Sequence, residues 1–273
     1  MTGKLRRRAA RAKGVLVLAR RIAGLGPGRV ARARLFVVTL ALGARWILRR
    51  PSARLRTLTV CLGGVTRDLV VSDYGELQVL RDIALDEEYA VAAGEPRTIV
   101  DLGANIGIAA AWFRSRYPEA MIVAVEPDPD SFAKLERNLA GDRLITLVNA
   151  AVGASNGTRT LFRPAGYSIA SSLDPGGGEP GSEVAVPVRT LDDILAGEGV
   201  RQIDLLKLDV EGAEGDALEG FTRLDDLELL LGEVHPRLLA EGADAFFARL
   251  LAFEVERGAE TADAISFVAR RRA

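Results

Sequence analysis

One run of nine residues, IVDLGANIG at 99–107, constrains the fold of this chain most strongly. Its apolar start predicts a buried strand, which ends on Asp101 before a turn that holds Gly103 and Gly107. Glycine tolerates positive φ and lets a ligand approach the backbone closely, which a side chain would prevent. The residues from Ile108 to Arg116 predict a helix whose N-terminus faces the same ligand. The order of strand, glycine turn and helix is typical of a nucleotide-binding loop in a parallel α/β domain.

A second apolar strand is predicted over 121–125, and it ends on Glu126, 25 residues after Asp101. An acid at this place can accept hydrogen bonds from both hydroxyls of a ribose. The loop departs from the dinucleotide pattern G-x-G-x-x-G, because Asn105 stands where a second glycine would admit a pyrophosphate. Its spacing D-x-G-x-N-x-G resembles the first motif of Rossmann-like methyltransferases, whose cofactor S-adenosylmethionine carries no phosphate. That resemblance puts Asp101 near the amino-acid tail of the cofactor or at the turn; the alternative is an ordinary glycine turn without a ligand.

Strands and helices alternate over the rest of the chain. A helix opens with Asp128 as its N-cap and Pro129 in its first turn, and a third strand is expected over 144–153. A fourth and a fifth strand follow within 203–209 and 227–234. The connecting helices require parallel strands, whose carboxyl ends meet at one edge of the sheet. We therefore predict an α/β fold of the Rossmann-like methyltransferase type, with a mostly parallel central sheet and helices on both faces.

Five motifs then occur in a fixed order: DLGANIG, AVEPDP, TLDDI, LLKLDVEGAE and LGEVHP. Together they resemble the FkbM family of S-adenosylmethionine-dependent methyltransferases over roughly residues 75–270, and LLKLDVEGAE is the most distinctive of the five. The resemblance implies O-methylation of a hydroxyl on a sugar, glycolipid or natural-product acceptor. It places Asp209 and Glu211 where the methyl donor and the acceptor meet. The expected cofactor-binding residues are Asp101, Gly103, Asn105, Gly107, Glu126, Pro127, Asn149 and Ala150.

Transfer of a methyl group to an alcohol benefits from a base, because an alcohol is a very weak acid. His235 is the first candidate, since an unperturbed imidazole has a pKa of about 6.5 and is mostly neutral at working pH. Asp209 is the rival base, and a histidine at a strand end is alternatively a hydrogen-bonded cap of the sheet. Asp209, Glu211, Glu214 and Glu233 also offer oxygen ligands for Mg²⁺. Carboxylates near a sulfonium need no metal to explain them, so a reaction without a metal site is the favoured interpretation.

The formal net charge of −1 conceals a segregation of charge along the sequence. Residues 1–50 hold 14 Lys or Arg and no acid, whereas the other 223 residues hold 22 basic and 37 acidic side chains. The apolar runs at 14–19 and 35–44 are too short to span a bilayer. A basic, amphipathic and non-spanning segment is typical of a helix on an anionic membrane surface. The alternative is a basic helical pair that packs on the body of the protein or lies loose in solution.

The chain is expected to have three segments, which are a basic helical extension at 1–50, a β-hairpin and helix at 51–96, and the S-adenosylmethionine-binding domain at 97–273. Gly63 and Gly64 separate the two strands of the hairpin, and its helix is expected over 76–89. A stretch at 166–182 rich in Ser, Gly and Pro predicts a substrate-shaping lid or a variable surface loop. Its candidate substrate contacts are Tyr167, Ser168, Ser171 and Ser172.

Composition separates the remaining function classes. The single Cys61 excludes an intramolecular disulfide and predicts a cytoplasmic protein, peripheral at the inner membrane face where the basic extension binds lipid. With one His and one Cys, a zinc site of Cys and His ligands is not available. An NAD-dependent oxidoreductase and a non-catalytic membrane-associated binding protein are the alternative functions. A nucleic-acid partner is disfavoured, because the body is acidic and shows no basic groove interleaved with aromatic residues.

Overall fold

The computed structural model describes residues 2–50, 54–91, 94–163, 171–173, 181–239 and 241–272. Of the candidate substrate contacts, Ser171 and Ser172 lie within these ranges, whereas Tyr167 and Ser168 lie outside the described residues.

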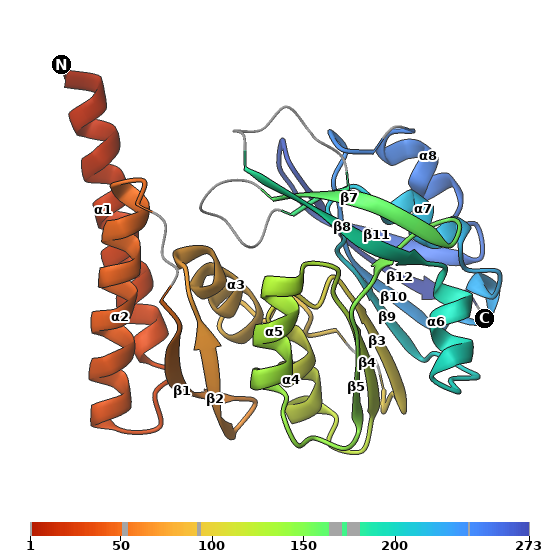
Figure 1. Ribbon diagram of the computed structural model, residues 1–273, viewed down its shortest axis with the longest axis horizontal. Helices are drawn as coiled ribbons and strands as arrows, with labels where there is room; N and C mark the ends of the chain where they lie inside the picture. Colours follow the sequence, from red (N-terminus) through yellow and green to blue (C-terminus); the bar gives the residue numbers. More distant parts are fainter. Residues whose placement is uncertain are drawn as a thin grey trace.

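Two long helices, α1 (Thr2–Ala23) and α2 (Arg29–Ile47), form a pair at the left of Figure 1. They approach closely at Gly43, which has no side chain; a Cβ there would lie 2.3 Å from a methyl group of Val15. Many of their apolar side chains are buried against the body, so the pair packs on the protein and does not lie loose in solution, whereas Val17, Val30, Val37 and Leu48 stay exposed. The buried apolar residues of the pair include Val15, Leu18, Ile22, Leu35 and Leu42. Within the described part of the chain, no helix combines the length and apolar composition needed to cross a bilayer.

The expected hairpin is present as β1 (Arg56–Leu62) and β2 (Val65–Val71), which pair in antiparallel register. Two glycines with positive φ, Gly63 and Gly64, make the turn. The hairpin lies against the helical pair, and the Cys61 N–H donates to the carbonyl of Leu25, in the loop between α1 and α2, at 2.7 Å. The hairpin therefore joins the basic extension to the rest of the molecule.

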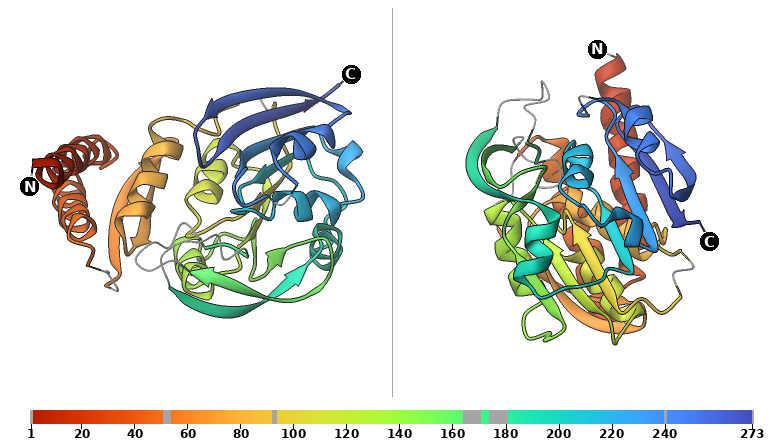
Figure 2. Two further views of the ribbon diagram at one scale, coloured as in Figure 1. Left: turned by 90° about the horizontal axis from the view of Figure 1, so that it is seen from above. Right: turned by 90° about the vertical axis from the view of Figure 1, so that its right-hand side faces the viewer.

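Helix α3 spans Tyr74–Ala84, whereas the sequence predicted a helix at 76–89. It begins earlier because Asp73 is the N-cap and forms a capping box with Glu76. It ends five residues early, where the acidic run at 86–88 would face the negative end of the helix dipole. In Figures 1 and 2 this helix lies between the hairpin and the central sheet.

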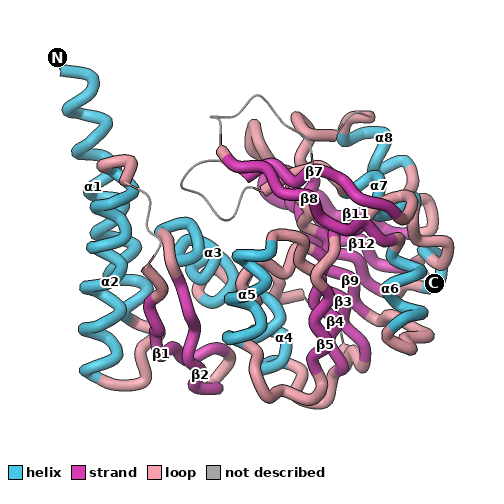
Figure 3. The backbone as a smooth tube through the Cα atoms, in the orientation of Figure 1, coloured by secondary structure: helices cyan, strands magenta, loops and turns pink. Residues whose placement is uncertain are grey.

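Seven strands form the central sheet in the order β11-β12-β10-β9-β3-β4-β5 (Figure 3). The five strands from β10 to β5 are parallel, and β12 is antiparallel to both of its neighbours. The antiparallel pair at the edge was not predicted from the sequence. The strand bounds are β3 Thr98–Leu102, β4 Met121–Val125, β5 Ile145–Val148, β9 Leu205–Leu208, β10 Leu229–Val234, β11 Phe253–Glu260 and β12 Ile265–Arg271.

Successive residues of each central strand face opposite sides of the sheet, and both sides are buried. Ile99 packs in the cluster that holds Phe113 of α4, whereas Val100 packs in the cluster that holds Ile194 of α6 and Phe246 of α8. Helices on both faces were predicted and are confirmed. These helices are α4 Ile108–Arg116, α5 Pro129–Asn138, α6 Leu191–Gly197, α7 Glu214–Glu219, the short 3-10 turn Leu224–Asp226 and α8 Ala243–Ala248.

The single strand expected over 144–153 is wrong in one respect, because the chain forms β5 and then the separate strand β6 (Ala151–Val152). Between them the Asn149 side-chain amide donates to the carbonyls of Glu126 and Pro127, at 2.8 and 3.2 Å. β6 leaves the central sheet and pairs with β8 (Ser182–Arg189). β8 also pairs with β7 (Gly157–Arg163), so a three-stranded sheet flanks the stretch at 166–182.

Candidate active site

The loop after β3 has the backbone shape that its glycines require. Gly103 has φ +76, and a Cβ there would lie 1.8 Å from the carbonyl oxygen of Asp209. Gly107 has φ +87, and its Cβ would lie 2.7 Å from a methyl group of Leu135. Asn105 also adopts the left-handed region, with φ +50. Side chains are therefore excluded at both glycines, and the backbone of the loop is open to a ligand.

Glu126 follows the neighbouring strand β4 and faces this loop. Its carboxylate accepts a hydrogen bond from the Asn105 N–H and another from the Asp128 N–H, both at 2.8 Å. Burial raises the pKa of Glu126 to about 7. A carboxylate offers about four lone-pair positions, so two remain for hydroxyl donors on the side that lines the cleft. The sequence-predicted ribose acid is thus held rigidly beside the glycine loop.

A buried ion pair lies beneath the same loop. The Lys207 ammonium is 3.0 Å from the Asp101 carboxylate and donates to the backbone carbonyls of Gly103 and Leu102, at 2.8 and 3.2 Å. Burial lowers the pKa of Lys207, but the carboxylates of Asp101 and Asp209 raise it by more, so the ammonium stays charged. Asp101 is fully buried and anchors the turn from below. No role was predicted for Lys207 from the sequence, so its support of the loop was missed.

The strand ends surround a cleft of about 530 Å³. Of the residues nominated from the sequence, those that line it are Gly103, Asn105, Glu126, Pro127, Ala150, Ser171, Asp209, Glu211 and Glu233. Asp101, Gly107, Asn149 and His235 are not among its lining residues, and they support the lining residues from behind. The opposite wall comes from α3 and the segment after it, in which the sequence predicted a helix but no site residue. Its lining residues are Glu76, Val79, Ile83, Glu88 and Tyr89.

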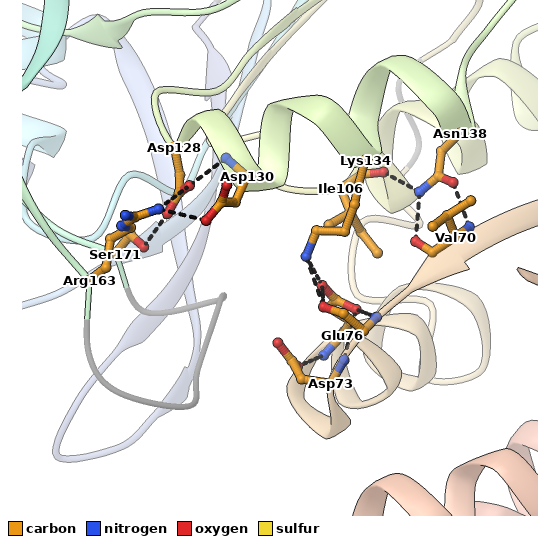
Figure 4. Close-up of polar contacts among 11 residues, drawn as sticks. Val70, Asp73, Glu76, Ile106, Asp128, Asp130, Lys134, Asn138, Arg163 and Ser171 are labelled. Atoms are coloured by element: carbon orange, nitrogen blue, oxygen red, sulfur yellow. Dashed lines mark hydrogen bonds and ion pairs between the residues drawn. The ribbon is translucent and has the colours of Figure 1, made fainter. Parts of the chain in front are cut away.

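Helix α5 ties this opposite wall to the loop, as Figure 4 shows. Lys134 forms a buried ion pair with Glu76 of α3. The Asn138 side chain accepts from the Val70 N–H at 2.6 Å and donates to the Ile106 carbonyl at 2.7 Å. The hairpin, α3 and the glycine loop are thus fixed to one helix.

The other end of α5 is bound to the three-stranded sheet (Figure 4). Asp128 caps the helix by accepting from the Asp130 N–H at 2.8 Å, and it also accepts from the Ser171 hydroxyl at 3.1 Å. The Arg163 guanidinium lies 2.8 Å from the Asp130 carboxylate. Ser171 lines the cleft, whereas the Ser172 hydroxyl donates to the Glu211 carbonyl.

His235 lies behind the cleft within a group of acids, a setting that favours the charged imidazolium over the neutral ring expected from the sequence. Its Nδ1 is 2.7 Å from Oε1 of Glu214, and its Nε2 is 3.5 Å from Oε2 of Glu211 and 3.9 Å from Oε2 of Glu233. Burial lowers the pKa of His235, but the hydrogen bond that its ring donates to Glu214 and the charges of Glu211 and Asp209 raise it to about 10. The favoured imidazolium form has no lone pair with which to accept a proton, which makes His235 a weaker candidate for the base than Asp209.

Asp209 lies closer to the reacting region, since it lines the cleft and its side chain is 28% exposed. Three further carboxyl groups line the cleft, Glu211 and Glu233 near Asp209 and Glu88 on the opposite wall. Burial, with the nearby charges of Glu233 and Asp209, raises the pKa of Glu88 to about 8, and burial raises that of Glu211 to about 7. Burial also raises the pKa of Glu233. These acids together favour a positively charged group in the cleft, and Asp209, Glu211 and Glu233 are exposed to a similar degree, 28–29%.

The acids could also serve as metal ligands. Asp209, Glu233 and His235 each offer one ligand atom, and these atoms lie within 4.8 Å of one another. The negative charge of these carboxylates would equally stabilise a sulfonium cation in the cleft. The residues of the cleft thus fit a cationic cofactor without requiring a metal ion.

Known methyltransferases are similar to this chain. The family model described as methyltransferase FkbM domain matches residues 101–261. Methyltransferase sdnD of Sordaria araneosa is 34% identical over 153 residues, 45% of this chain and 59% of that protein. The 31-O-demethyl-FK506 methyltransferase FkbM of Streptomyces tacrolimicus is 30% identical over 196 residues, 59% of this chain and 75% of that protein. The hexuronic acid methyltransferase AglP of Haloferax volcanii is 26% identical over 199 residues, 70% of this chain and 79% of that protein.

The aligned part of the chain thus spans less than two thirds of the length of methyltransferase sdnD. Among solved structures, methyltransferase FkbM from Methylobacillus flagellatus aligns with 97% of this chain and 59% of its own, with a TM-score of 0.48 and 14% identity. The family match covers more than half of the chain and includes the glycine loop, Glu126 and the acids after β9. The chain therefore belongs to the FkbM methyltransferase family.

Proposed function

We propose that this methyltransferase uses S-adenosylmethionine and methylates a hydroxyl of a sugar, glycolipid or natural-product acceptor. The observation that carries the proposal is the Glu126 carboxylate, held at the cleft by two backbone N–H groups beside a glycine loop without a pyrophosphate site. The names of two relatives support the acceptor class, since one acts on 31-O-demethyl-FK506 and the other on a hexuronic acid.

The residues of the cleft fit this cofactor. Gly103 lines the cleft, and the Asp209 carbonyl oxygen leaves no room for a side chain at this position. Glu126 supplies acceptors for two ribose hydroxyls, and Pro127 and Ala150 line the same part of the cleft. The acidic wall supplies negative charge for a sulfonium. S-adenosylmethionine brings an electrophilic methyl group on that sulfonium.

Asp209 has the best position to accept the proton of the acceptor hydroxyl. Its carboxylate faces the cleft, and the Lys207 ammonium lies 3.7 Å behind it. Glu88 and Glu211, whose pKa values are raised to about 8 and about 7, are partly protonated near neutral pH and reduce the repulsion that Asp209 meets. The His235 imidazolium fixes Glu211 and Glu214 through its two ring nitrogens. In this scheme the reaction proceeds without a metal ion.

Calorimetric titration tests the cofactor. The protein should bind S-adenosylmethionine and S-adenosylhomocysteine but not NAD. Glu126→Gln replaces a carboxylate acceptor by an amide and should weaken S-adenosylmethionine binding, measured at pH 8 where the carboxyl is mostly ionised, by about ten- to a hundred-fold, or about 1.5–3 kcal/mol. Glu136→Gln, an equal charge change at an exposed site on α5, should leave the dissociation constant within about twofold. Unchanged affinity in Glu126→Gln, or NAD binding by the parent, contradicts the proposal.

The acceptor class needs a separate experiment. Transfer of an isotope-labelled methyl group into extracts of cells that lack the gene, followed by mass spectrometry, identifies the product. An ether-linked methyl on a hydroxyl supports the proposal, whereas a labelled amine, thiol or carbon replaces it.

A further inference from the structure

An arginine-lined hollow lies at the end of the helical pair where α1 begins and α2 ends. Its volume is about 540 Å³. The described residues that line it are Arg7, Arg8, Arg11, Ile47, Leu48 and Arg49. They include no carboxylate, and the first acid in the whole sequence is Asp68. The guanidinium groups of Arg7, Arg8 and Arg11 gather in this one concavity, and they favour a ligand that carries several anionic oxygens.

The aromatic residue beside the hollow is already engaged. The Trp46 ring stacks on Tyr74 with ring centres 5.1 Å apart, and the Arg11 guanidinium lies 5.2 Å from the centre of the same ring. The indole therefore already has two partners. Single-stranded nucleic acid is usually held by bases that stack on free aromatic faces, so this site does not favour it.

A membrane surface fits the hollow better than an isolated anion does. Leu48 lines the hollow and is 54% exposed, so it offers an apolar contact between the arginines. The amino end of α1 projects past α2 in Figure 1, which leaves this end of the pair free to meet a flat surface. We propose that the hollow binds the phosphate groups of anionic phospholipids and attaches the protein to a membrane through charge.

The packing of the pair fixes the character of this attachment. Leu18, Leu35 and Leu42, from the apolar runs seen in the sequence, are buried against the body and cannot enter the lipid, whereas Val17 and Val37 of the same runs are 47% and 61% exposed. Attachment at the hollow depends mainly on the arginines, with Leu48 as the apolar contact that lines it, and salt should reverse most of it. Through Tyr74 the hollow adjoins the start of α3, and α3 contributes Val79 and Ile83 to the cleft. A protein attached at the hollow therefore holds its cleft beside the membrane.

Co-sedimentation of the full chain with vesicles tests the proposal, with phosphatidylglycerol in phosphatidylcholine compared with phosphatidylcholine alone. Each basic residue near an anionic surface contributes about fivefold to binding, so Arg7→Gln/Arg8→Gln should bind anionic vesicles about thirtyfold more weakly. Arg29→Gln/Arg34→Gln is the matched control, because it removes the same charge from the other half of α2, about 20–27 Å along the helix from Ile47. The control should bind within about threefold of the parent.

Two further measurements keep the result interpretable. Arg7→Lys/Arg8→Lys retains the charge and should bind like the parent, and thermal unfolding shows whether each variant is folded. Equal losses in the two glutamine pairs would show diffuse attraction rather than a site at the hollow. Binding that persists at 1 M salt, full competition by millimolar inorganic phosphate, or a preference for RNA over anionic vesicles would each overturn the proposal.

Discussion

The ion pair between Lys207 and Asp101 permits the sharpest test of how the cofactor loop is held. Lys207→Met removes the ammonium 3.0 Å from Asp101 and withdraws the donor to the Gly103 and Leu102 carbonyls. Both side chains of the pair are almost completely buried, with 3% and 0% exposure. Removal of one partner from a buried pair costs about 3–5 kcal/mol, because the remaining charge has no compensation. That is a large fraction of the stability of a typical domain, about 5–15 kcal/mol.

The second variant separates charge from packing. Asp101→Leu/Lys207→Met replaces the pair by apolar side chains of similar size, which is often nearly neutral in buried sites. The double variant should therefore be more stable than Lys207→Met alone by at least about 1.5 kcal/mol, although it carries one more substitution. Lys13→Met, at an exposed position on α1, is the control for the loss of a lysine and should change stability by less than about 0.5 kcal/mol.

Urea unfolding followed by the fluorescence of Trp46 and Trp112 measures these differences. Burial raises the pKa of Asp101, so in Lys207→Met the folded state gains stability where this carboxyl is protonated and loses it as the pH rises. The deficit of the single variant should then be smaller at pH 5 than at pH 8. A loss of less than about 1 kcal/mol in Lys207→Met would refute the reasoning. So would a double variant whose loss equals the sum of the losses measured for Asp101→Leu and Lys207→Met separately.

The remaining predictions concern catalysis and pH. Asp209→Asn should lower kcat about 10²- to 10⁴-fold while calorimetry finds S-adenosylmethionine affinity within about threefold of the parent; near-normal turnover would exclude Asp209 as the base. Treatment with a chelator should leave kcat within about twofold, and activity restored only by Mg²⁺ would assign Asp209, Glu233 and His235 to a metal. Because the pKa of folded His235 is raised to about 10, its contribution to stability should be complete below about pH 6.5 and vanish as the pH rises through 10. His235→Gln should remove this pH dependence from urea unfolding curves.

Local patterns predicted the central fold because each depends on neighbouring residues. The strand, loop and helix from Thr98 to Arg116 follow from apolar runs, glycines with positive φ and a helix stop before Pro118. The third strand was predicted too long because its break at Asn149 depends on hydrogen bonds to the backbone of Glu126 and Pro127. These partners lie 22 and 23 residues away, outside the reach of periodicity.

The site shows the same division between local and distant determinants. The place of Glu126 follows from its strand, and the structure puts it beside Asn105 as expected. The charge of His235 could not be read from the sequence, because it depends on Glu214, 21 residues away, and on three more acids brought together by the sheet edge. Glu88 was missed for the same reason, since only the fold sets it near Glu233 and Asp209.

The apolar cluster that begins in the helical pair has a consequence for the order in which the chain is made. Leu35 and Leu42 share one cluster with Leu77 of α3 and with Leu205 and Leu231 of the central strands. The pair is synthesised first, but it can cover its apolar face only after the hairpin and α3 have followed, and the last members of the cluster come more than 150 residues later. At about 5–20 residues per second that interval is tens of seconds at the slow end. During it, the arginines on the outer face keep the nascent helices hydrated and mutually repelling, so the charge of this segment also protects an unfinished chain from aggregation.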